Sequence, residues 1–391
     1  MPYKNDKISL PAQKGERLLS IDALRGFIMA IMAIDHASFF ISKVHAEEFW
    51  GISLPGYDHI LTFITRFITH ICAPGFFFLL GVSMALFARS RRKAGWTEKK
   101  IFRYFAFRGL LLIMLQMFIE NPAWFIGLLQ SPGLIINPPG GGGAVYFHFG
   151  VLYGLGAAMI IWAMLLRLGR YFYILFSIGA ILVPQFLIPS SAASSHLFSP
   201  LLRLLLIPGQ TGHMQVFYSI LPWLGLTGLG LAFGELLEEN RKQASRAALF
   251  CSIVSFFLFV VIRVLGGFGN IHPPSGHDLI SFLNMTKYPA SLSFILITMT
   301  VNLIMFVFFE RFIERLGIFK KFLLTLGRAA LFFYILHLYL FAFMGFFFPN
   351  GLKLELMYLF WLMGLLILYP LCRWYGNFKQ TTSLESFWRF F

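Results

Sequence analysis

Ten apolar runs dominate this 391-residue chain, and each is long enough for a helix to cross a bilayer. Hydrophobic residues make up 58% of the sequence and charged residues 13%, which is more apolar surface than a water-soluble domain of this length buries. The runs lie near residues 24–43, 60–88, 104–123, 146–166, 171–188, 216–237, 247–265, 288–309, 322–346 and 354–372. We therefore predict an all-α polytopic membrane protein of about ten transmembrane helices.

The orientation follows from where the basic residues lie. With a cytoplasmic N-terminus, 26 of the 32 lysines and arginines fall in cytoplasmic segments, as the positive-inside rule requires. Both termini are thus expected in the cytoplasm, as tails over 1–20 and 376–391 of a single transmembrane domain spanning 1–391. The first run is expected to be retained, because the charged N-terminal stretch has no evident signal-peptide cleavage site. Outer connections near 44–59, 124–145, 189–215 and 266–287 are expected to roof a pocket.

The net charge of +15 does not indicate nucleic-acid binding, because the basic residues cluster between the apolar runs and no nucleic-acid motif is present. Membrane lipids are the expected partner of these basic loops. The three cysteines, Cys72, Cys251 and Cys372, form no CxxC pair or Cys/His cluster. No metal site and no disulfide framework are therefore predicted.

The first apolar run carries a polar face. Arg25 and His36 are eleven residues apart, almost three whole helical turns, so they lie on one face about 16 Å apart along the axis. Asp22 precedes Arg25 by three residues and joins the same face. Asp35 lies about 100° around the helix from His36, so a direct bond between the two is not expected. Ionisable groups at membrane depth are costly and by default indicate function.

A second polar face lies in the second run. His59, Arg66 and His70 follow spacings of seven and four, so they share one helical face. His148 begins the fourth run and His337 lies within the ninth. For these last two histidines, a hydrogen bond to a neighbouring helix is an equally good explanation.

Several segments carry a family resemblance. The arginine-to-histidine spacing of Arg25 and His36 resembles the first-helix motif of the acyltransferase-three family of membrane acyl transferases. Six segments are more similar to bacterial relatives of heparan-α-glucosaminide N-acetyltransferase, in an order that covers about residues 17 to 375. They are 17–26 (RLLSIDALRG), 65–81 (from TRFITHICAP to FLLG), 221–225 (LPWLG), 286–292 (TKYPASL), 327–337 (from GR to FYILH) and 372–374 (CRW).

This resemblance implies an acyl transfer across the membrane. It implies a cytoplasmic acyl-CoA donor, with acetyl-CoA preferred, and an extracytoplasmic acceptor, a sugar or amino sugar of a glycan. It also implies a bacterial cytoplasmic (inner) membrane as the location. A homodimer, the acceptor's identity and the acyl chain length stay open.

Candidate roles follow from the two polar faces and the resemblance together. His36 is the expected general base, with His70, Asp35 and Arg66 as further catalytic residues. Direct transfer and an acyl-histidine intermediate both stay open. Arginines near the inner boundary are expected to hold the phosphates of coenzyme A, although snorkelling also explains two of them. These donor-binding candidates are Arg25, Arg108 and Arg328, and the acceptor-binding candidates are Asp22, His59, His148, Lys287, Tyr288 and His337.

The main alternative is a proton-coupled transporter or flippase that uses the same histidines as a relay. No internal repeat of the kind that many transporters carry is evident in the sequence. An enzyme is expected to bind or slowly hydrolyse acyl-CoA, whereas a pure transporter is expected to ignore it.

Overall fold

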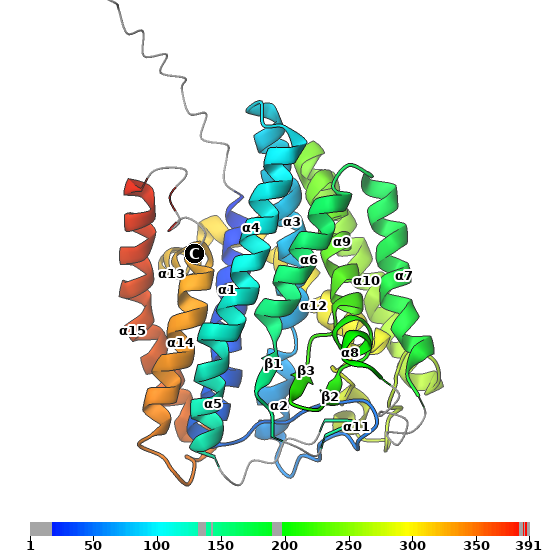
Figure 1. Ribbon diagram of the computed structural model, residues 1–391, viewed down its shortest axis with the longest axis vertical. Helices are drawn as coiled ribbons and strands as arrows, with labels where there is room; N and C mark the ends of the chain where they lie inside the picture. The colour runs from blue at the N-terminus through cyan, green and yellow to red at the C-terminus, as the bar shows by residue number, and fades with distance from the viewer. Residues whose placement is uncertain are drawn as a thin grey trace, which may run out of the picture.

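The computed structural model describes residues 18–131, 138–141, 144–189 and 198–382, together with 386 and 388. Within these ranges the chain is mostly helical, and the long helices run side by side in one bundle (Figure 1). Eight helical segments in this part of the chain are long and apolar enough to cross a membrane, or nine if one bent pair counts as a span. This confirms the predicted all-α polytopic membrane protein.

All ten predicted apolar runs coincide with helices, of which the 15-residue α6 falls short of the length of a full span. The main helices are α1 (Leu19–Ala37), α2 (Ile60–Thr69), α3 (Cys72–Lys93), α4 (Glu98–Leu115), α5 (Asn121–Leu129), α6 (Val151–Leu165), α7 (Arg170–Leu187), α9 (Ile220–Glu239), α10 (Arg241–Leu265), α12 (Leu292–Phe312), α13 (Ile318–Arg328), α14 (Ala330–Gly345) and α15 (Leu354–Thr381). The shorter elements are η1 (Ser38–Ser42), η2 (Gln116–Glu120), α8 (Pro200–Leu205), α11 (Leu279–Leu283), η4 (Ile313–Arg315), β1 (Phe147–Phe149), β2 (Gly209–Thr211) and β3 (Met214–Val216).

The two ends of the bundle differ in character. Helix α1 begins and α15 ends at the same end, which is the upper one in Figure 1. The small sheet, in the order β1-β3-β2, lies toward the opposite end with α8 and α11. The first and last helices therefore agree with the prediction that both termini share one side, and the cytoplasmic identity of that side stays a prediction.

The predicted single helix over 60–88 is wrong in one respect, because His70 and Ile71 separate α2 from α3. Pro74, near the start of α3, has no N–H to donate to the carbonyl of His70. On α12, Asn302 Nδ2 donates to the Ile71 carbonyl at 3.0 Å and supports the break. His70 thus lies where the backbone changes direction in the middle of the bundle.

Four other boundaries also differ from the predictions. The run 146–166 begins as β1, because that segment pairs in parallel with β3, and its helix α6 starts only at Val151. The run 322–346 bends by 90° between α13 and α14. Helix α5 extends into the expected outer connection 124–145. Helix α15 continues past 376 to Thr381, and its last turns are held by Tyr375, which stacks on the Phe332 ring at 4.2 Å.

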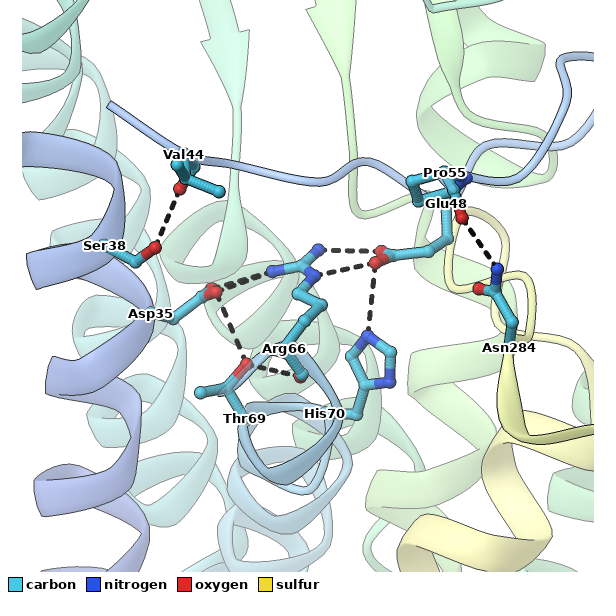
Figure 2. Close-up of polar contacts among 9 residues, drawn as sticks. All are labelled: Asp35, Ser38, Val44, Glu48, Pro55, Arg66, Thr69, His70 and Asn284. Carbon is cyan, nitrogen blue, oxygen red and sulfur yellow. Dashed lines mark hydrogen bonds and ion pairs between the residues drawn. The ribbon is translucent and has the colours of Figure 1, made fainter. Parts of the chain in front are cut away.

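The loop between α1 and α2 is fastened to the loop before α12. The Glu48 carbonyl accepts the backbone N–H groups of Lys287 and Tyr288, each at 3.0 Å. Trp50 donates its backbone N–H to the Tyr288 carbonyl at 2.8 Å, and Asn284 Nδ2 donates to the Pro55 carbonyl at 2.9 Å (Figure 2). Two of the four predicted outer connections therefore do lie together over the bundle.

At the other end, α1 and α13 touch backbone to backbone. A Cβ atom on Gly26 would lie 2.0 Å from the Leu323 carbonyl oxygen, and one on Gly327 would lie 1.9 Å from the Asp22 carbonyl oxygen. Only glycine allows this approach. The contact brings together Arg25, which precedes Gly26 on α1, and Arg328, which follows Gly327 on α13.

Candidate active site

A buried group of charges joins α1, α2 and the loop between them. The Arg66 guanidinium lies between two carboxylates (Figure 2). Its Nη1 donates to both oxygens of Asp35 at 2.7 and 3.0 Å, and its Nε and Nη2 donate to Glu48 at 2.7 Å each. His70 Nε2 lies 3.3 Å from the same Glu48 carboxylate, and Thr69 Oγ1 lies 3.4 Å from Asp35. We call these five residues the ion-pair cluster.

The ion-pair cluster explains how a fully buried loop carboxylate stays ionised. Burial alone would raise the pKa of Glu48, but the neighbouring Arg66 guanidinium and the hydrogen bonds hold that pKa well below its ordinary value. Lys287 lies close by, and burial next to Arg66 lowers its pKa to about 8. Burial raises the pKa of Glu47 to about 8, so at neutral pH this neighbouring carboxyl is protonated.

Beside this cluster, α1 and α14 bring two histidines together. His36 Nδ1 lies 2.5 Å from His337 Nε2, and the two rings stack with centroids 4.8 Å apart. His337 Nδ1 lies 3.1 Å from the Phe333 carbonyl oxygen, which only accepts, so Nδ1 carries the proton of His337. His337 Nε2 is then an acceptor, and His36 donates to it from Nδ1. The lone pair of His36 is therefore on Nε2.

We call His36 and His337 the histidine pair. No hydrogen bond to His36 Nε2 is found among the described residues, and the His36 side chain is buried. Trp124 packs edge-on against the His36 ring at 5.1 Å, and Tyr334 does so at 6.2 Å. A histidine oriented through one nitrogen and unbonded at the other is the arrangement of a general base or a nucleophile.

Trp124 is the centre of an aromatic group around the histidine pair. The centroid of the His148 ring stacks at 6.3 Å from that of Trp124, and the His45 ring lies tilted at the same distance. Burial lowers the pKa of His45 and of His148 to about 4, so both rings are neutral at neutral pH. His148 belongs to β1 rather than to a helix, and its ring also stacks on Phe217 at 4.8 Å.

The opposite end of α1 carries the donor-binding candidates. Arg25 Nη1 donates to Asp22 at 3.2 Å and to the Gly327 carbonyl at 3.3 Å, and its Nη2 donates to Ser83 Oγ at 2.8 Å. Arg328 Nε donates to the other Asp22 oxygen at 3.2 Å. Asp22 thus joins Arg25 to Arg328, and it precedes Asp35 by 13 residues and His36 by 14 residues on α1.

Some predicted residues are not part of these groups. Arg108, on α4, bonds to Tyr104 one turn earlier. His59 is exposed at the start of α2, and its side chain has no hydrogen bond among the described residues. Tyr288 packs on Phe49 at 5.0 Å, and Lys287 lies over the Tyr288 ring at 5.2 Å. The last two thus contact the outer loop that carries Glu48.

The sequence reasoning missed three polar residues of the outer loop, His45, Glu47 and Glu48. It also missed Glu120 of the third run and Trp124, the first residue of the expected outer connection 124–145. A signal was present, because a histidine and two adjacent glutamates are unusual where only 13% of residues are charged. Among the described residues, no three His, Cys, Asp or Glu side chains are arranged to hold a metal ion.

A comparison with protein families matches residues 17–266 to the family described as heparan-alpha-glucosaminide N-acetyltransferase, catalytic. The match runs from the start of α1 to the end of α10, and so includes the whole ion-pair cluster and His36. His337 lies beyond it. A comparison with individual curated proteins gives no match. Because the family match covers well over half of the chain, the protein belongs to the heparan-alpha-glucosaminide N-acetyltransferase family and is a transmembrane acetyltransferase.

Proposed function

We propose that the protein moves an acetyl group from cytoplasmic acetyl-CoA to an extracytoplasmic acceptor, a sugar or amino sugar of a glycan, in a bacterial inner membrane. The observation that carries this proposal is the histidine pair. His36 Nε2 has a lone pair and no described hydrogen bond, while Nδ1 is held by His337. On the same helix, Arg25 lies about 16 Å along the axis from His36. Arg25 and Arg328, which share Asp22, supply the donor-side end of the proposed route.

In direct transfer, an acceptor O–H or N–H attacks the thioester carbonyl while His36 Nε2 takes its proton. The bond from carbonyl carbon to sulfur breaks, and the proton on Nε2 passes to the departing thiolate. The products are the acetylated acceptor and coenzyme A with a free thiol. In the second route, Nε2 itself attacks the thioester and an acetyl-imidazole forms first. The hydrogen bond to His337 assists both routes, because it stabilises positive charge on His36.

The arginines suit the donor. Coenzyme A carries phosphates, and guanidinium groups bind phosphate through paired N–H donors. Asp22 holds Arg25 and Arg328 in place, and the Arg328 side chain is 36% exposed and so accessible. Arg108 remains a third candidate for the same role, on a separate helix.

The ion-pair cluster is assigned a supporting role next to the histidine pair. Most of the donors of Arg66 are occupied by Asp35 and Glu48, so we propose that Arg66 fixes these carboxylates. His70 Nδ1 is buried without a hydrogen-bond partner in the described part of the chain, which makes His70 the second acid–base candidate. His59, His148, Lys287 and Tyr288 remain proposed contacts of the acceptor.

The rival function, a proton relay in a transporter, needs a chain of groups that both accept and donate protons. The chain from His36 through His337 ends at the Phe333 carbonyl, which does not pass a proton on. Because this path for protons ends there, the geometry favours His36 as the base of a chemical reaction over His36 as part of a proton relay.

Purified protein in sealed vesicles tests the proposal. Acetyl-CoA labelled in the acetyl group is supplied on one side and glucosamine on the other. We expect labelled N-acetylglucosamine to accumulate on the glucosamine side at a rate that depends on both substrates. If the protein neither transfers acetyl groups nor hydrolyses acetyl-CoA, and takes up protons without acetyl-CoA, then it is the transporter instead.

The acetyl transfer rate is expected to fall above about pH 8. Below this pH, Lys287 is charged and Glu47 is protonated, so together with Arg66, Asp35 and Glu48 they carry no net charge. Above it, Lys287 loses its proton and Glu47 loses one as well, which leaves two uncompensated negative charges. A profile of kcat/KM between pH 6 and 10 measures this. The double variant Lys287→Met/Glu47→Gln is expected to flatten the alkaline limb, and an unchanged limb in that variant would contradict the assignment.

A further inference from the structure

One buried carboxyl near the histidine pair has no role in the proposed mechanism. Glu120 ends η2, the π-helical turn between α4 and α5, and its side chain is 1% exposed. The elements η2 and α5 pack on α14, the helix that carries His337, and Figure 1 shows α5 beside α14. π-Helical turns inside α-helices frequently occur at functional sites.

The two carboxylate oxygens of Glu120 have different surroundings. Oε1 accepts a hydrogen bond from Trp124 Nε1 at 3.1 Å. Oε2 is buried and has no hydrogen bond of ordinary geometry among the described residues, and the polar neighbours of the carboxyl are Tyr334 and Gln116. Within the described ranges, no lysine, arginine or histidine forms an ion pair with Glu120. A buried polar atom left unpaired is costly, so such an atom calls for an explanation.

The surrounding structure holds this carboxyl in place. Tyr339, on α14, donates its hydroxyl to the Ile119 carbonyl of the π-helical turn at 2.7 Å. Gln130 Nε2, just after α5, donates to the Ala342 carbonyl of the same helix at 3.1 Å. A Cβ atom on Gly150 would lie 2.9 Å from Glu120 Oε1, so the glycine leaves room for the carboxyl. The unpaired oxygen is therefore not the result of a loosely attached segment.

Glu120 is also connected to the proposed base. Trp124, which bonds to Glu120 Oε1, packs its ring against His36, and Tyr334 packs against both the His36 ring and the carboxyl. Glu120 and His36 thus share two neighbouring side chains, Trp124 and Tyr334. The carboxyl lies close to the base that is proposed to deprotonate the acetyl acceptor. An acceptor sugar that reacts at His36 carries further O–H and N–H groups beside the one that reacts.

We propose that Glu120 is a substrate-binding residue whose Oε2 receives a hydrogen bond from an O–H or N–H group of the bound acceptor. This inference rests on the proposed acetyl transfer. It adds a contact on the third span to the contacts proposed for the acceptor on the other elements. A sugar or amino sugar carries several such donors on one molecule.

Glucosamine kinetics of Glu120→Gln in the vesicle assay test this contact. The amide oxygen of glutamine still accepts from Trp124 Nε1, but the amide nitrogen at the Oε2 position donates. We expect KM for glucosamine to rise about tenfold or more, with KM for acetyl-CoA unchanged. The matched control is Glu98→Gln, the same substitution at the other end of the same span, where Glu98 pairs with Arg92. Its KM for glucosamine is expected to change by less than about threefold.

The outcomes separate the two proposals. If the wild-type protein acetylates no glucosamine, the proposed function fails before Glu120 is tested. If it does, an unchanged KM for glucosamine in Glu120→Gln overturns the inference, as does an equal rise in Glu98→Gln. Glu120→Asp, which keeps a carboxyl on a shorter side chain, is the second variant when Glu120→Gln inserts poorly. Its KM for glucosamine is expected to rise above the wild-type value, and a wild-type KM in Glu120→Asp also overturns the inference.

Discussion

Replacing His36 by alanine is expected to reduce acetyl transfer to glucosamine by about a thousandfold, since a positioned general base contributes roughly 10²–10⁴ in rate. The reason is that His36 Nε2 is the lone pair that His337 orients through Nδ1. Initial rates in vesicles, with detergent-extracted protein checked for a single monodisperse species, measure the effect. The matched control is His277→Ala, because His277 is exposed and its side chain contacts neither group of the site.

His337 provides the sharper comparison, because it acts through His36. In His337→Gln, the amide oxygen still accepts from His36 Nδ1, whereas in His337→Phe that N–H loses its partner. We expect the glutamine variant to keep several times the activity of the phenylalanine variant. Wild-type turnover in His36→Ala, or equal activity in the two His337 variants, would remove the histidine pair from the mechanism.

The sequence located the apolar helices better than it predicted their shape. About ten spans were expected, and the described residues contain eight, or nine if the bent pair counts as one. Hydrophobic length alone located the ten runs, because a bilayer imposes one length on every span. It did not predict the break at His70 or the 90° bend before α14, although Pro74 in one case and Gly327 in the other were present. These features depend on which helix packs against the break, as Asn302 and Gly26 do. Length and composition carry no information about that packing.

For the site, helical periodicity predicted which side chains share a face but not which helices face each other. It placed Asp22 with Arg25. The structure adds Arg328, which lies 306 residues after Asp22, and the Gly327 carbonyl, which lies 302 residues after Arg25. It gave His36 and His337 separately, and only the packing of α14 on α1 joins them. The loop carboxylate Glu48 was missed, because a residue between two spans is ordinarily solvated and here is fully buried.

Replacing Glu48 by alanine is expected to lower the free energy of unfolding by about 3–5 kcal/mol, since removing one partner of a buried ion pair leaves the other charge uncompensated. Arg66 would lose the partner of its Nε and Nη2 groups, and His70 would lose its neighbour. The matched control is Glu314→Ala, which removes a surface ion pair with Lys320 and is expected to cost about 1 kcal/mol or less.

The pH dependence gives this prediction a sign. The folded-state pKa of Glu48 lies below its ordinary value of 4.5, so the carboxylate contributes stability above pH 4.5 and loses it as the pH falls toward the folded-state pKa. Glu48→Gln has no proton to gain there, and its stability is expected to depend less on acid than that of the wild type. Thermal unfolding in detergent between pH 3 and 7 measures both effects. If Glu48→Ala costs no more than Glu314→Ala, or if the acid dependence survives in Glu48→Gln, then Glu48 is not what fastens the outer loop to Arg66, and the fixed position of Asp35 next to His36 needs another cause.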